Sequence, residues 1–404
     1  MSNGMNASIG KINRRRLIGW GGLAAAGAPL LGAGPAHAAG IPPGTRPGGP
    51  YDRYVAQLAA EGKFSGVVLL AHRGRTVLSR SYGLADRERG IPNRESTAFA
   101  LSSAGKPFHA VAILQLAQQG RLQLSDPVGK YLTGFDPAIA ERVTIHHLLS
   151  GLSGTDTPAE DVQRVFRSRD EVRGYYQQRA RQATLVGIPG VPSPTHQEAE
   201  TTIPALLVEA LTGGTYWDYV EENIFRRAGM TGSAFYTRPQ WLTDRHLAHP
   251  YMTVADGSRV DAVRHLDQGS PYPYILGKNP GRAFIDAPGD GGFATAPDLV
   301  RFTQALTDGT LLDRPWSDVF LAPKIPHGPT SFAAYGLSLD IVGGQSAYQR
   351  AGGNPGVGAN WSIYPDTGWT GVILSNHDNF PLVEMLGQEV QAITGVAPGE
   401  SEGG

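Results

Sequence analysis

The segment that decides the fold reads Ala100-Leu101-Ser102-Ser103-Ala104-Gly105-Lys106-Pro107-Phe108, and it runs directly into His109-Ala110-Val111-Ala112-Ile113-Leu114-Gln115-Leu116. The second stretch is helix-forming and apolar nearly all round, which predicts a buried helix. Pro107 is tolerated only in the first turn, where its missing N–H has no partner to lose. The helix must therefore begin near Ser103, which places Ser103 and Lys106 on the same face.

This spacing has a chemical use. A serine hydroxyl is a weak nucleophile until a base removes its proton. A lysine can be that base when burial lowers its pKa toward neutrality, whereas an arginine does not deprotonate. The helix N-terminus also favours developing anions. The alternative is a helix cap followed by a solvated lysine, but the segment around Lys106 is apolar. We therefore expect Ser103 to be the nucleophile and Lys106 its base.

Several further motifs follow in one order along the chain. They are Gly120-Arg121-Leu122, Asp126-Pro127-Val128, Val143-Thr144-Ile145-His146-His147-Leu148-Leu149, Asn223-Ile224-Phe225, Gly291-Gly292-Phe293 and Gly353-Asn354-Pro355-Gly356. Together with Ser103-Ala104-Gly105-Lys106, a Ser-x-x-Lys motif, they resemble the β-lactamase-related serine hydrolases. The branch most similar contains class C β-lactamases, penicillin-binding proteins, D-aminopeptidases and esterases. The resemblance implies an acyl-enzyme on Ser103 and hydrolysis of an amide, ester or lactam.

The second motif of that family, usually Tyr-x-Asn after a Pro-Gly, is altered here. After Pro189-Gly190, His196 stands at the tyrosine place and Glu198 at the asparagine place. His196 could replace the tyrosine as proton carrier, since its unperturbed pKa of about 6.5 suits that work. Glu198 could orient His196 or pair with Lys106. The alternative is that both are ordinary loop residues in a site whose activity is altered or lost.

The third motif, normally Lys-Thr-Gly or His-x-Gly, reads Arg350-Ala351-Gly352 and is expected to bind substrate. Arg350 keeps the positive charge of the motif, and its planar fork suits a substrate carboxylate, although it cannot relay a proton. By resemblance, the backbone N–H groups of Ser103 and Gly353 would form the oxyanion hole.

Strand-like segments lie at both ends of the chain, around a long helical middle. They form an expected hairpin at 64–70 and 76–82 and four later strands at 335–342, 346–350, 359–364 and 370–375, before a last helix at 381–394. This order predicts an α+β fold, with one antiparallel sheet built from chain-distant parts, flanking helices and an inserted helical domain. We expect a catalytic domain at 51–404, with the sheet part at about 51–100 and 281–404 and the helical part at about 101–280.

The first forty residues resemble an export signal. Arg14-Arg15-Arg16-Leu17-Ile18 precedes an uncharged Gly- and Ala-rich run, and Ala36-His37-Ala38 supplies a cleavage pattern. We expect a twin-arginine-type signal peptide at 1–38, a mature chain that begins near Ala39, a Pro/Gly linker at 39–50, and a periplasmic or extracellular location. A membrane anchor is disfavoured, because the run is weakly apolar for a span and contains Pro29.

Composition excludes several other classes. The net charge of −1 and the absence of a basic run in the mature chain argue against a nucleic-acid partner. No cysteine is present, which removes disulfides, thiolate metal sites and cysteine nucleophiles. There is no metal-ligand spacing, and His146-His147 is expected to be structural. We expect no cofactor, a small-molecule or peptide substrate that can carry a carboxylate, and no stable membrane insertion after signal cleavage.

Three functions fit these observations. The first is a hydrolase that releases the acyl group from Ser103 with water. The second is an acyltransferase or cyclase on the same scaffold that tailors a natural product, which the altered motif at His196 and Glu198 favours. The third is a catalytically silent binding protein, since a fold does not fix a function.

Overall fold

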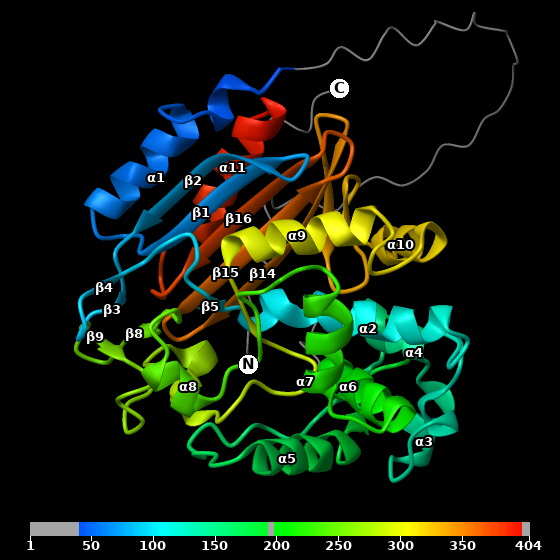
Figure 1. Cartoon of the computed structure of the whole chain (residues 1–404). Helices are drawn as coiled ribbons and strands as arrows, with labels where there is room; N and C mark the ends of the chain where they lie inside the picture. The colour runs from blue at the N-terminus through cyan, green and yellow to red at the C-terminus, as the bar shows by residue number, and fades with distance from the viewer. Residues whose placement is uncertain (1–39, 193–197, 398–404) are drawn as a thin grey trace, which may run out of the picture.

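The centre of the molecule is an eight-stranded antiparallel sheet, seen in a computed structural model that describes residues 40–192 and 198–397 (Figure 1). Its strand order is β11-β12-β13-β14-β15-β16-β1-β2. The strands are β11 (Ile325–Pro326), β12 (Ser331–Ala333), β13 (Ser338–Val342), β14 (Gln345–Asn354), β15 (Val357–Tyr364), β16 (Trp369–Ser375), β1 (Gly66–His72) and β2 (Arg75–Tyr82).

The N-terminal hairpin joins the C-terminal strands edge to edge. β1 pairs with β16 from Gly66↔Ser375 to His72↔Trp369, and it pairs with β2 on its other side. The predicted hairpin, the four later strands and the single α+β sheet from distant parts of the chain are confirmed. The bounds differ by up to four residues. β14 runs on to Asn354, and Tyr335 lies within a turn in which Ala334 N donates to Leu337 O, so β13 begins only at Ser338.

Helices cover both faces of the sheet. Because side chains alternate along a strand, Val68 and Leu70 of β1 face one layer, and Val67 and Leu69 face the other. The first layer contains α1 (Pro50–Ala60) and α11 (Leu382–Thr394), and the second contains α9 (Ala296–Thr307) and α10 (Arg314–Leu321) (Figure 1). The predicted last helix is thus confirmed as α11.

The segment expected to be a linker is folded against this first layer. Pro43–Thr45 forms a short 3-10 helix, and Thr45 is fully buried. A Cβ on Gly44 would lie only 2.9 Å from the Cα of Ala392 in α11. Gly48 N donates to the Asp52 carboxylate at 2.7 Å, which ties the segment to α1. Residues 40–50 therefore belong to the packed domain, and the expectation of a loose spacer is wrong there.

The middle of the chain forms the inserted helical part. Its helices are α2 (Lys106–Gln118), α3 (Pro137–Arg142), α4 (Ile145–Ser150), α5 (Arg169–Arg181), α6 (Ala199–Thr212), α7 (Tyr216–Val220) and α8 (Arg238–Thr243). Two short strand pairs lie within it, β6 (Thr155–Asp156) with β7 (Thr184–Leu185) and β8 (Tyr251–Thr253) with β9 (Arg259–Asp261). Two more lie outside it, β3 (Leu84–Asp86) with β4 (Ile91–Pro92) and β5 (Phe99–Ala100) with β10 (Phe293–Ala294). The helical prediction is confirmed to about residue 243, and loops with β8 and β9 replace it beyond that point.

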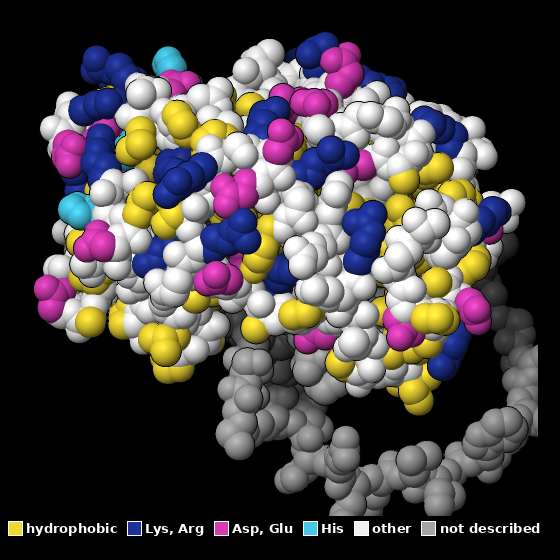
Figure 2. All heavy atoms as spheres, turned by 90° about the horizontal axis from the view of Figure 1, so that it is seen from below, with side chains coloured by type: hydrophobic (Ala, Val, Ile, Leu, Met, Phe, Trp, Pro, Cys, Tyr) yellow, Lys and Arg dark blue, Asp and Glu magenta, His cyan; other side chains and the backbone are white. Residues whose placement is uncertain are grey.

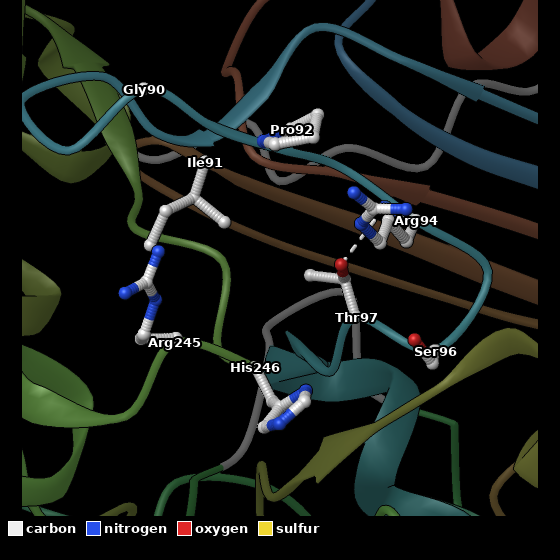
Figure 3. Close-up of a pocket in the computed structure, with 8 residues that line it drawn as sticks. All are labelled: Gly90, Ile91, Pro92, Arg94, Ser96, Thr97, Arg245 and His246. Atoms are coloured by element: carbon white, nitrogen blue, oxygen red, sulfur yellow. Dashed lines mark hydrogen bonds between the residues drawn. The ribbon is translucent and has the colours of Figure 1, made fainter.

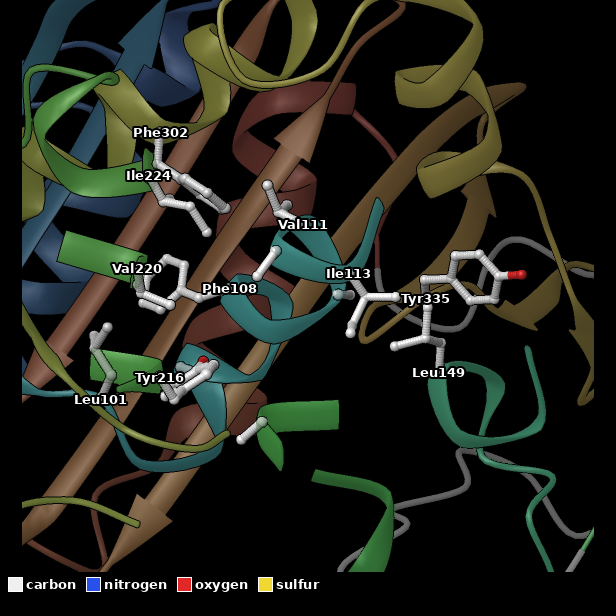
Figure 4. Packing of buried hydrophobic residues seen from close by; sticks show 14 of the residues in the cluster. Leu101, Phe108, Val111, Ile113, Leu149, Tyr216, Val220, Ile224, Phe302 and Tyr335 are labelled. Atoms are coloured by element: carbon white, nitrogen blue, oxygen red, sulfur yellow. The ribbon is translucent and has the colours of Figure 1, made fainter. Parts of the chain in front are cut away.

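Helix α2 lies at the centre of the main core, as its sequence predicts. Every residue from Lys106 to Ala117 is buried. Phe108 packs edge-on against Phe225 and Phe302, with ring centroids 5.0 Å apart in both pairs. Figure 4 shows Phe108 and Phe302 among the buried side chains of this core. Aromatic pairs of this geometry stabilise a core beyond the area that they bury. The helix start is therefore held rigidly, and with it the position of Ser103.

The expected signal peptide lies outside the described residues. Among the helices that the structure describes, none is long and apolar enough to cross a bilayer. Figure 2 shows one face of the molecule, on which Lys and Arg side chains alternate with Asp and Glu and with scattered apolar groups. This face carries no extended field of one sign.

Candidate active site

Ser103 lies on a 3-10 turn, η2 (Ser102–Gly105), that connects β5 to α2. In a 3-10 turn, side chains three residues apart align, so Ser103 and Lys106 share one face as expected. Pro107 occupies the first turn of α2. Ser102 has φ +49°, a left-handed backbone that costs a non-glycine residue about 1–2 kcal/mol. Its hydroxyl donates to Gly353 O at 3.0 Å, which anchors the turn beside the nucleophile.

Lys106 is buried, with 6% of its surface exposed. Burial lowers the pKa of its ammonium below the usual range, and the nearby carboxylate of Asp290 partly opposes this effect. Lys106 Nζ lies 3.9 Å from Asp290 Oδ2. The solvated-lysine alternative is therefore excluded, and the side chain is placed where it can exist as a neutral base.

The third motif, Arg350-Ala351-Gly352 on strand β14, lies along η2, the turn that carries Ser103 (the nucleophile turn). A Cβ on Gly352 would overlap Leu101 O and would come within 2.9 Å of Ser103 N, so only glycine allows this approach. Ala351 and Gly353 are exposed on either side of the buried Gly352, as strand alternation requires. The structure thus brings the backbone at Gly352 against the amide of Ser103. The oxyanion hole at Ser103 and Gly353 stays a prediction.

Arg350 is placed differently from the expectation of a free carboxylate clamp. Its Nε donates to the backbone carbonyl of Ser103 at 2.9 Å. Burial lowers the pKa of its guanidinium, and Asp290 partly offsets that effect. On the next strand, Trp361 Nε1 donates to Ala104 O at 2.9 Å. Both side chains hold the nucleophile turn against the sheet, so part of the Arg350 fork is already engaged within the protein.

Glu198 does not pair with Lys106, which was one of the two roles open to it. It directly precedes α6, and its Oε2 lies 2.6 Å from Nη2 of Arg179, a side chain from α5. Arg179 Nη2 also donates to Pro158 O at 2.6 Å. The charge of Glu198 still raises the pKa of Lys106 across space. His196, its expected companion, lies outside the described residues.

Two acidic residues that sequence analysis missed lie close to the site. One is Asp290, whose Oδ2 lies 3.9 Å from Lys106 Nζ. The other, Glu200, accepts hydrogen bonds from Ser153 N at 3.0 Å and Ser153 Oγ at 2.8 Å. Burial raises the pKa of Glu200 to about 7, while the charge of Lys106 acts in the opposite direction. One signal was available for Asp290, because it is the only charged residue in a glycine-rich run.

The remaining candidates have structural contacts. His147 Nδ1 accepts from Thr144 N at 3.2 Å in a capping box that begins α4. His146 Nδ1 lies 2.7 Å from the hydroxyl of Tyr335. Within the described residues, no group of three or more His, Asp or Glu side chains is arranged to hold a metal ion.

Two surface hollows share no lining residue with the site. One, of about 300 Å³, is bordered by basic side chains that include Arg94, Arg245 and His246 (Figure 3). The other, of about 710 Å³, is lined by residues of α9 and α10 and of the β15–β16 hairpin, among them Thr303, Asp318 and Trp369. The candidate active site is therefore identified by its side chains, Ser103 and the buried Lys106, and not by the volume of a pocket.

Comparison with known proteins identifies the family and the fold of the chain. The family model described as Beta-lactamase matches residues 51–392. PbpX of Bacillus subtilis (strain 168), named for penicillin binding, is 28% identical over 326 residues, which cover 78% of this chain and 71% of PbpX. Esterase EstB of Burkholderia gladioli is 46% identical over 92 residues, 22% of this chain and 24% of EstB. The crystal structure of a penicillin binding protein from Bacillus halodurans aligns with a TM-score of 0.69 at 25% identity, over 82% of this chain and 97% of that one.

Proposed function

Because the chain belongs to the Beta-lactamase family of serine hydrolases, we propose that it is an exported enzyme that hydrolyses an amide, ester or lactam through an acyl-enzyme on Ser103. The observation that carries the proposal is the buried Lys106, three residues after Ser103 at the start of a buried helix. A lysine in this position has no structural advantage over an apolar residue, since burying a charge is unfavourable. The basic cluster at Arg14–Arg16 supports export.

Acylation needs a neutral Lys106. Its Nζ accepts the proton of Ser103 Oγ as the oxygen attacks the carbonyl carbon of the substrate. The carbonyl oxygen becomes an oxyanion, which the N–H groups of Ser103 and Gly353 stabilise. The bond to the leaving group then breaks, and the leaving group takes the proton from the Lys106 ammonium. The acyl-enzyme and the neutral base remain.

Deacylation repeats the same proton path with water. Lys106 removes a proton from the attacking water, and the oxyanion forms again in the same place. Ser103 Oγ leaves and recovers its proton from Lys106, so the carboxylic acid is released and the enzyme is restored. A positioned acid–base group typically contributes about 10²–10⁴ in rate to such steps.

The likeness to EstB favours an ester as the scissile bond. EstB is named as an esterase, and the 92 matched residues show a higher identity than the longer match to PbpX. An ester is also chemically the easier substrate, since its leaving group needs less protonation than an amine. The missing Tyr-x-Asn motif fits a reaction with this lower demand.

Covalent labelling tests the proposal. A fluorophosphonate should modify the wild-type protein once, and the modified peptide in mass spectrometry should contain Ser103. Ser103→Ala should remain folded and unlabelled and should lose several orders of magnitude in ester hydrolysis. Full turnover by Ser103→Ala would refute the mechanism.

The same experiment separates the two other functions. A transferase would pass the acyl group from Ser103 to an added amine or alcohol, and the new amide or ester would be detected as product. A silent binding protein would remain unlabelled and would turn over no ester. Release of free acid as the main product supports the hydrolase.

A further inference from the structure

The Gly289-Asp290-Gly291-Gly292 segment is a strap clamped against the active site. A Cβ on Gly289 would overlap the carbonyl of Thr201 in α6, and a Cβ on Gly105 would overlap the carbonyl of Gly291. Such close approach of backbones is possible only with glycine. The strap therefore lies between the start of α2 and the start of α6.

Hydrogen bonds fix the strap at both ends. Burial lowers the pKa of His109 to about 4, so its ring is neutral, and its Nδ1 lies 2.9 Å from Gly289 O. Gly292 N donates to the carboxylate of Asp286 at 2.7 Å, and Leu101 N donates to Gly292 O at 2.9 Å. The only side chain on this rigid strap is that of Asp290, which is consequently held in one place.

Asp290 lies close to Lys106 and acts through its charge on Arg350. Its Oδ2 lies 3.9 Å from Lys106 Nζ, and 31% of its side chain is exposed, so it is open to a bound molecule. Its charge also acts on Arg350, whose Nε is engaged by Ser103 O. The Asp290 carboxylate therefore offsets part of the positive charge that would attract a substrate carboxylate.

We propose that Asp290 is a specificity-determining residue that makes the site select uncharged acyl donors over carboxylate-bearing ones. This inference rests on the proposed function and names its substrate class. A substrate carboxylate beside Arg350 would also feel the charge of Asp290, and two carboxylates a few ångströms apart repel each other. An uncharged acyl group meets no such repulsion. This reverses the expectation that Arg350 selects a carboxylate.

A matched pair of esters tests the inference. 4-Nitrophenyl butyrate and the mono-4-nitrophenyl ester of succinic acid share a leaving group and chain length, but only the second carries a carboxylate. Hydrolysis is followed at one pH by release of 4-nitrophenolate. We expect the wild-type kcat/KM to be at least about tenfold higher for the butyrate, and Asp290→Asn to reduce that ratio by at least about tenfold.

Two further variants act as controls. Asp290→Glu keeps the charge and should keep the preference for the butyrate. Asp170→Asn removes one exposed carboxylate in the first turn of α5 and should leave the ratio unchanged. Equal kcat/KM for the two esters in the wild type, or an unchanged ratio in a folded Asp290→Asn, would overturn the inference. No hydrolysis of either ester above the level of Ser103→Ala would instead overturn the proposed function, and the inference with it.

Discussion

Arg350 donates its Nε to the backbone carbonyl of Ser103 at 2.9 Å. The third motif, at Arg350, thus contacts the residue that we propose as nucleophile through a side-chain N–H. The contact fixes the orientation of the nucleophile turn relative to strand β14. A residue expected to bind the substrate is therefore also a positioning residue for Ser103.

Substitution of Arg350 should reveal this positioning role. Arg350→Lys keeps the charge but removes the Nε donor, so kcat/KM should fall about tenfold or more, by the same factor for the butyrate and succinate esters. Steady-state kinetics on both esters checks this. A loss confined to the succinate ester would show that Arg350 acts as a carboxylate clamp.

Lys106 should control the pH dependence of acylation. Only its neutral form accepts a proton, so kcat/KM should rise with pH through the pKa of Lys106, which burial places below the usual value of 10.5. Lys106→Arg should abolish this rise with pH and lower kcat/KM by a factor of about 10²–10⁴. Asp290→Asn should move the rise in kcat/KM to lower pH, because the Asp290 carboxylate raises the pKa of Lys106 and the amide does not. Rate profiles between about pH 5 and pH 10 measure both effects, and an active Lys106→Arg would contradict the assignment.

Gly352 should tolerate no side chain. A methyl group there would overlap Leu101 O and crowd Ser103 N, and backbone atoms cannot move away cheaply. Gly352→Ala should cost about 1–3 kcal/mol of stability and slow fluorophosphonate labelling of Ser103. Gly214→Ala is the matched control, since a Cβ there meets nothing within 4 Å. Thermal unfolding and labelling rates compare the two variants, and identical behaviour would refute the close approach.

A buried carboxyl behind the sheet should make stability depend on pH. Glu389 of α11 is fully buried, and burial raises the pKa of its carboxyl to about 7 from an ordinary 4.5. The folded state holds this proton more tightly than the unfolded state, so its contribution to stability falls as pH rises from about 4.5 to about 7, by about 3 kcal/mol.

Glu389→Gln isolates this effect. The amide cannot ionise, and its oxygen can still accept from the hydroxyl of Tyr364, which donates to Glu389 at 3.3 Å. The unfolding free energy of the variant minus that of the wild type should increase between about pH 4.5 and pH 7, because only the wild type loses stability there, and it should then level off. Denaturant titrations at several pH values measure it. A difference that does not change with pH would mean that the carboxyl ionises normally in the fold.

Export should be visible at the N-terminus. Secreted material should begin near Ala39, after cleavage behind Ala36-His37-Ala38. N-terminal sequencing of the periplasmic or medium fraction tests this, with replacement of Arg14 and Arg15 by Lys as the matched variant that should block secretion. An intact leader on cytoplasmic protein would refute the proposal.

The sequence by itself determined those features that depend on neighbouring residues. Pro107 and the apolar run after it predicted where the buried helix begins, and the spacing of Ser103 and Lys106 followed from that start. Alternation and turn residues predicted the hairpin and four strands of the sheet. These signals are local, because helix termini and strand periodicity depend on residues a few positions apart.

Only the tertiary structure decided which charges meet. Asp290 lies near Lys106 because the Gly289–Gly292 strap passes between α2 and α6. Glu198 pairs with Arg179, and not with Lys106, because α5 packs beside α6. Arg350, which the sequence predicted to bind a substrate carboxylate, donates to the carbonyl of Ser103 because β14 packs against the turn that carries Ser103. Electrostatic partners are set by distances of a few ångströms between segments far apart in the chain, and no local pattern encodes those distances.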